Sequence, residues 1–151
     1  MKSAPIESKL VGRRVITGTT NINITVRLED KGGYVKDAVF FEMVGEFGHG
    51  RSITMQLNLF KLRRLAVALG HAAKNRTTSY KEFTDSNNIK KQLSLNFDDG
   101  MKCWLNMTSS DGGKAGRECG YYDLVALEST LNTLCDHCEG ELYEMQKGKN
   151  I

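Results

Sequence analysis

Arginine, lysine and tryptophan side chains at a few positions of this sequence could hold a ligand that is both charged and flat. Arg51 and Arg117 each follow a glycine, which leaves backbone amides accessible and the arginine able to reach a phosphate. Trp104, the only tryptophan, stands two positions after Lys102 and offers a flat ring. Stacking of one nucleic-acid base on such a ring is worth about 1 to 3 kcal/mol. These residue types favour phosphate neutralisation combined with base stacking. Two plainer interpretations stay open: loop arginines beside turn glycines, and a Trp104 that covers a second layer or a dimer interface.

The two glycine-arginine pairs, at positions 50–51 and 116–117, belong to a pattern that occurs twice. In both copies, alternating strands lead to the pair and then to an amphipathic helix, which starts at about Asn58 in the first copy and about Asp123 in the second. The spacing between the copies is that of a duplicated supersecondary unit.

Polar and apolar residues alternate in several stretches, and this period predicts about three strands before each helix. The clearest strands are 21–28, 39–43 and 53–57 in the first unit, and 93–97 and 103–107 in the second. The stretch 14–19 is either the start of the first strand or a separate strand bent at Gly18. Asn58 is the expected N-cap of the first helix, and Gly140 is a place where the second could end or kink. Glycines and aspartates predict turns at Gly45–Gly50 and Asp98–Gly100 and a loop at 109–116.

These elements predict an α+β fold of two antiparallel β-sheet units, each followed by an amphipathic helix. We expect the first unit at 1–75, a linker rich in Thr, Ser and Asn at 76–90, and the second unit at 91–151, with a shared core. The face of the strands turned away from the helices is polar. It includes Arg27, Phe40, Lys102 and Trp104 among asparagine, glutamine, serine and threonine side chains.

Charge is unevenly distributed along the chain. Residues 1–97 carry sixteen Lys/Arg against eight Asp/Glu, residues 98–117 balance, and residues 118–151 carry seven acids against two lysines. The basic part favours a polyanionic partner, and the acidic last helix is either a surface for a protein partner or a solvated face. The sequence contains no apolar run long enough to span a membrane and no export signal, so we expect a cytoplasmic protein with four reduced cysteines.

Metal binding and catalysis have little support in the sequence. Cys135-Asp136-His137-Cys138 resembles half of a zinc site, but Cys103 and Cys119 are too far apart to form the second close pair. The three histidines are scattered, with no nucleophile motif and no phosphate-binding loop beside them. We therefore expect no metal, no cofactor, no catalytic residue and no enzymatic activity.

The segment Arg51-Ser52-Ile53-Thr54-Met55-Gln56-Leu57-Asn58, with the helix after it, resembles the whirly-type single-stranded-DNA-binding fold. The likeness is to the transcription coactivator positive cofactor four and its prokaryotic and phage relatives. Arg117-Glu118-Cys119-Gly120 repeats the form more loosely. The resemblance implies a curved sheet that binds a looped single strand and protomers that pair through their helices, here as two halves of one chain or as a homodimer.

The resemblance and the polar face together predict a protein that binds single-stranded DNA or RNA with little sequence preference, in replication, recombination or transcription. The expected contact residues are Arg27, Phe40, Arg51, Lys102, Trp104 and Arg117. The alternative is a small phage- or plasmid-type protein-interaction module, a regulator or inhibitor, that uses the same sheet face.

Overall fold

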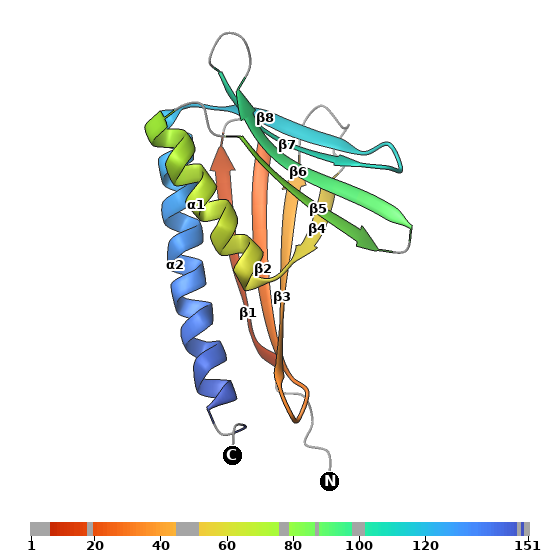
Figure 1. Ribbon diagram of the computed structural model, residues 1–151, viewed down its shortest axis with the longest axis vertical. Coiled ribbons are helices and arrows are strands. Elements are labelled where there is room, and N and C mark those ends of the chain that lie inside the picture. The colour runs from red at the N-terminus through yellow and green to blue at the C-terminus, as the bar shows by residue number, and fades with distance from the viewer. Residues whose placement is uncertain are drawn as a thin grey trace.

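The computed structural model describes residues 7–17, 20–44, 52–75, 79–86, 88–97, 102–147 and 149. The fold is α+β, as predicted, with two four-stranded antiparallel sheets that are each followed by one helix. Sheet A consists of β1 (Glu7–Thr17), β2 (Thr20–Asp30), β3 (Val35–Val44) and β4 (Ser52–Leu57), and α1 (Leu59–Asn75) follows it. Sheet B consists of β5 (Tyr80–Ser86), β6 (Ile89–Phe97), β7 (Cys103–Ser109) and β8 (Lys114–Cys119), and α2 (Tyr121–Gln146) follows it. Sheet B crosses one end of sheet A, and the two helices lie side by side (Figure 1).

Each unit contains one more strand than the sequence predicts. In the first unit the fourth strand is β1, paired antiparallel with β2, so of the two alternatives for the stretch before β2 the separate strand is correct. In the second it is β5, which lies inside the range 76–90 that we expected to be a linker. Both are edge strands, at the outer ends of their sheets. β5 was missed because a charged residue, Glu82, occupies one of its buried positions and hides the apolar alternation.

Smaller differences concern turns and helix ends. The loop expected at 109–116 is shorter, since β8 begins at Lys114 and the turn closes through Gly112, whose φ of +101° lies in the region that favours glycine. Helix α2 does not end at Gly140 but continues to Gln146. The expected turns at Gly45–Gly50 and Asp98–Gly100 lie outside the described residues.

The first helix starts where the sequence predicts, because two side chains cap it. The Asn58 Oδ1 atom accepts a hydrogen bond of 2.8 Å from the Lys61 backbone N–H. The Asp37 carboxylate, from strand β3, accepts one of 2.7 Å from the Leu59 N–H. Two of the four backbone donors that a helix start leaves unpaired are thereby satisfied, and an anionic group lies at the positive end of the helix dipole.

We expect Asn58→Ala to lower the free energy of unfolding by about 1 kcal/mol, because it removes the acceptor of the Lys61 N–H. Urea unfolding followed by circular dichroism measures the change. Asn58→Ser is the control, since a serine oxygen can cap the same donor and should keep most of the stability. No loss in the alanine variant would show that the cap contributes nothing, and an equal loss in the serine variant would show that the loss does not come from the capping oxygen.

One apolar core unites both sheets and both helices. The buried leucines of α1, such as Leu62 and Leu69, and those of α2, such as Leu127 and Leu131, belong to the same cluster as the inward side chains of the strands. The apolar stripes of the two helices thus pack together and against the sheets. The two units therefore cover one shared hydrophobic surface.

The exposed sides of the helices are joined by Arg63 of α1. Its guanidinium donates to Asn132 Oδ1 at 2.9 Å, Asp136 Oδ1 at 2.6 Å and Glu139 Oε2 at 3.0 Å, all on α2. Part of the acidic charge of the last helix is thus neutralised within the molecule. At Gly70, an added Cβ would overlap the Glu128 carboxylate, so α1 and α2 approach closely at this point.

Candidate functional site

The outer face of sheet B, the face turned away from the core, carries a regular array of polar and aromatic side chains. Leu93, Leu95, Leu105 and Met107 are fully buried on the inner face, and strand alternation therefore sends their neighbours outward. The outward positions are Lys81, Phe83 and Asp85 on β5, Lys90, Gln92, Ser94 and Asn96 on β6, Trp104, Asn106 and Thr108 on β7, and Lys114, Gly116 and Glu118 on β8. The polar face predicted from the sequence is confirmed for this sheet.

Trp104 lies in the middle of β7, with Asn96 opposite it on one side and Glu118 opposite it on the other. Its side chain is half-buried. It borders an open hollow of about 410 Å³, whose lining also includes Ser94, Asn106 and Lys114. An aromatic ring and hydroxyl, amide and ammonium groups therefore line the same hollow.

Gly116 makes room for one of these groups. It is paired with Asn106, and a Cβ at position 116 would overlap the amide oxygen of that asparagine. A larger residue here would displace the Asn106 amide beside Trp104. The glycine of the second glycine-arginine pair thus has a steric role within the sheet.

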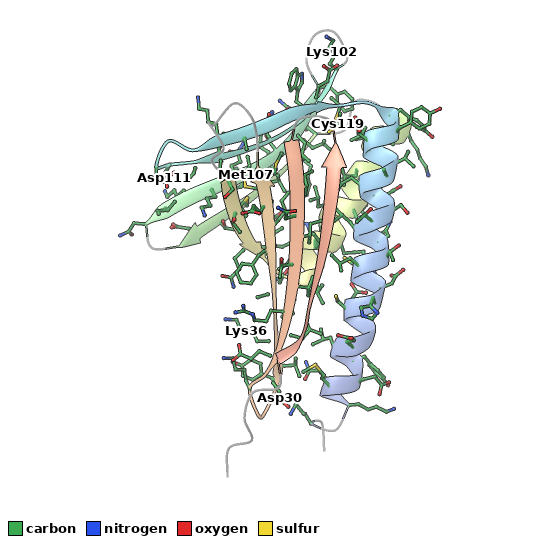
Figure 2. The ribbon with its side chains drawn as sticks, turned by 180° about the vertical axis from the view of Figure 1, so that it is seen from behind. Asp30, Lys36, Lys102, Met107, Asp111 and Cys119 are labelled. Carbon is green, nitrogen blue, oxygen red and sulfur yellow. The ribbon has the colours of Figure 1, made fainter. Side chains whose placement is uncertain are left out.

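Positive charge predominates on this face. Its outward strand positions include three lysines, Lys81, Lys90 and Lys114, and two acids, Asp85 and Glu118. Lys102 is exposed directly before β7, and it lies at the opposite end of the β7–β8 hairpin from Asp111 (Figure 2). Lys102 and Lys114 lie on either side of Trp104 along the β7–β8 hairpin, whereas Lys81 lies on β5 and Lys90 at the far end of β6. An elongated anion could contact several of them at once.

The outer face of sheet A brings together two other predicted residues. The guanidinium carbon of Arg27, on β2, lies 5.7 Å from the centre of the Phe40 ring on β3, a cation–π distance. Thr25 and Gln56 are the strand partners of Phe40 on either side. Arg27 and Phe40 thus form a second aromatic and basic platform, on a different sheet from Trp104.

Of the two arginines of the repeated pairs, only position 117 falls within the described residues. Arg51 lies outside the described residues. Position 117 lies in β8, in register with the buried Leu105 and between Ala115 and Cys119, so the strand assigns it to the face opposite Trp104. The structure therefore groups Lys102 with Trp104 and Arg27 with Phe40, and it separates position 117 from both pairs.

Sequence reasoning missed Phe83 and Lys81, both on the outer face of β5. Phe83 is 60% exposed. Both fall in the segment expected as a linker, so their strand was not recognised. The sequence gives little signal here, because the inward pair Tyr80 and Glu82 and the outward pair Lys81 and Phe83 each combine one aromatic and one charged residue.

The four cysteines form no disulfide, and they lie in two separate places. Cys103 and Cys119 are buried cross-strand partners on the inner face of sheet B, and Cys135 and Cys138 are buried on α2. Among the described residues, no group of three or more His, Cys, Asp or Glu side chains could hold a metal ion.

The thiols of Cys135 and Cys138 should be unreactive in the folded protein. Burial raises the pKa of each from 9.0 to about 11. At pH 8 the thiolate fraction is then roughly one in a thousand, and the thiolate is the reactive form. We expect slow labelling by a thiol reagent at pH 8 in native buffer and fast labelling in urea, with peptide mapping to assign the sites. Fast native labelling of either residue would contradict this.

The raised pKa values of Cys135 and Cys138 also predict how the stability of the fold depends on pH. An unfolded thiol releases its proton near pH 9, whereas the folded thiols keep theirs to about pH 11. The contribution of these groups to stability is therefore complete below pH 9 and is lost as the pH rises to 11. In Cys135→Ala/Cys138→Ala, the fall in unfolding free energy over this interval should be smaller.

The fold and this site define an α+β protein of two antiparallel sheets with a polar, aromatic and basic outer face. Within the described residues, neither helix is both long and apolar enough to cross a membrane. No protein-family model matches the chain, and no curated protein sequence matches it.

Proposed function

We propose that this protein binds single-stranded nucleic acid, without catalysing a reaction, through the outer faces of its two sheets. The observation that carries the proposal is the position of Trp104. The ring borders an open hollow that it shares with Ser94, Asn106 and Lys114. This combination supplies a stacking surface, hydrogen-bonding groups and a cation within one small area.

The chemistry of the face suits a single strand better than a duplex. Bases in a duplex are stacked on one another and show a protein only their edges, whereas an unpaired base can lay its flat face on an aromatic ring. Stacking accepts any base, so little sequence preference follows. Lysines near the ring neutralise phosphates, and binding should therefore weaken as salt rises.

The arrangement of the chain supports the resemblance to the whirly-type fold. Each unit has four strands followed by one helix, and the two helices lie against each other. In the proposed likeness, the two halves of one chain take the place of two paired protomers. A cytoplasmic role in replication, recombination or transcription fits this reading, with a homodimer and a protein partner on the acidic α2 as further parts of the proposal.

Titration of the intrinsic Trp104 fluorescence tests the proposal directly, because Trp104 is the only tryptophan. Mixed-sequence single-stranded DNA of about 30 nucleotides, the matching RNA and the duplex are each added at low and moderate salt. We expect quenching by single strands, weaker at higher salt, and little response to the duplex. Absence of a response to every nucleic acid would reject the proposal and favour a protein-interaction module that uses the same face.

The salt dependence of binding by lysine variants provides a second, quantitative test. Lys114→Ala removes a cation that lines the hollow, and each lost phosphate contact should make the slope of log K against log salt shallower by about 0.7. Lys147→Ala is the matched control, because Lys147 is an exposed lysine directly after α2 that pairs with Glu144. An unchanged slope in Lys114→Ala would remove Lys114 from the binding site.

A further inference from the structure

The outer face of sheet B contains a second aromatic ring, Phe83, which nothing in the fold accounts for. Phe83 is 60% exposed on the edge strand β5, so its ring contributes little to the core. Among the outer-face positions of sheet B defined above, the large apolar side chains are both aromatic, Trp104 and Phe83, and none is aliphatic. A face that presents flat rings among amides, hydroxyls and lysines suits bases better than the aliphatic side chains of a protein partner.

The strand register places Ser94 between the two rings. Trp104 on β7 pairs with Asn96 on β6, Ser94 is the next outward residue of β6, and Phe83 on β5 pairs with Gln92, the one after it. Trp104, Ser94 and Phe83 therefore lie on one diagonal across three adjacent strands. From a strand spacing of about 4.8 Å and a rise of about 3.4 Å per residue, the two rings start roughly 17 Å apart.

Charged groups flank this diagonal on both sides. Lys81 is the strand partner of Ser94, at the middle of the diagonal. Lys114 ends the row that runs from Phe83 through Gln92 and Thr108, and it lines the hollow beside Trp104. A chain with a phosphate at every step could place bases on the rings and phosphates near these lysines.

We infer that Phe83 is a second base-stacking platform and that a bound single strand crosses sheet B along the diagonal from Trp104 over Ser94 to Phe83. This inference rests on the proposed function and specifies the path of its ligand. It assigns a binding role to β5, and it requires a ligand long enough to reach from one ring to the other.

Two oligothymidines separate the platforms: a dinucleotide, which is too short to reach both rings and is detected by Trp104 only at the Trp104 end, and an oligomer of about fifteen nucleotides, which can cover both. Trp104 fluorescence reports binding of each. In Phe83→Ala we expect affinity for the longer oligomer to fall roughly five-fold to a hundred-fold, as loss of one stacked base implies, and affinity for the dinucleotide to stay unchanged. Phe83→Tyr keeps the ring and should bind like the wild type.

Tyr143→Ala is the matched control, because Tyr143 is 65% exposed but lies on the acidic helix α2. It should bind both oligomers like the wild type. If the wild type binds the long oligomer and Phe83→Ala binds it equally well, the inference is overturned while the proposed function stands. Equal weakening for both lengths would also overturn it, because Phe83 would then act at the Trp104 site. A wild type that binds neither oligomer would reject the proposed function and this inference together.

Discussion

Trp104→Ala is expected to weaken binding of single-stranded DNA by roughly five-fold to a hundred-fold through lost stacking alone. Because the groups beside the ring are also displaced, we expect this substitution to have the largest effect on binding. Loss of one stacked base costs about 1 to 3 kcal/mol, and each 1.4 kcal/mol is a factor of ten in affinity. The same change also enlarges the hollow that Ser94 and Asn106 line, so the hydrogen bonds that we propose these side chains make to a base would lose their geometry. Fluorescence anisotropy of a labelled oligonucleotide measures the affinity without relying on the tryptophan.

Trp104→Phe separates stacking from folding in this experiment. It keeps a flat ring on the outer face of β7 and should retain most of the affinity, whereas the alanine variant should not. Because Trp104 is half-buried, both variants are first compared by thermal unfolding, and binding is measured well below the lower midpoint. Unchanged binding by a folded Trp104→Ala protein would show that the ligand lies elsewhere.

Glu82→Ala is expected to lower the free energy of unfolding by about 2 to 4 kcal/mol. Glu82, on β5, is 6% exposed. Its Oε2 accepts a hydrogen bond of 2.7 Å from the Tyr80 hydroxyl, and its Oε1 lies 3.4 Å from the Lys61 Nζ of α1. Burial, and then the hydrogen bond to Glu82, raises the pKa of Tyr80. Without the carboxylate, the tyrosine hydroxyl and the lysine both lose their acceptor, and the link between α1 and the edge of sheet B is broken.

Urea unfolding provides the measurement, with Glu144→Ala as the control. Glu144 forms an exposed pair with Lys147, and such surface pairs contribute between zero and about 1 kcal/mol. A double-mutant cycle of Glu82→Ala with Lys61→Met isolates the coupling between the two charged groups. A loss in Glu82→Ala no larger than that in Glu144→Ala would show that Tyr80 and Lys61 find other partners.

The sequence by itself was sufficient to predict both helices, the Asn58 cap and the alternation of buried and outward residues in β2, β3, β4, β6 and β7. The apolar stripe of a helix and the alternation of a strand repeat at periods that the backbone sets, so a short stretch of sequence is enough to show them. For the same reason the sequence correctly placed Trp104 on a polar face. It also indicated that the two halves of the chain repeat one unit.

Strands β1 and β5 were decided by tertiary structure. An edge strand is held by pairing with one neighbour, so its own residues need not show a strong apolar period. In β5 an inward glutamate is tolerated only because Lys61, on a distant helix, and Tyr80 supply partners for it. A local pattern cannot include the partner that compensates a buried charge.

The composition of the candidate site was likewise decided by pairing between strands. Arg27 and Phe40 meet because β2 and β3 are in register, whereas position 117 falls in register with Leu105, on the face opposite Trp104. Phe83 joins Trp104 on one face only because β5, β6 and β7 are neighbours. The sequence determined which residues could stack on bases and bind phosphates, and the tertiary structure decided which of them share a face, because register depends on contacts between segments far apart in the chain.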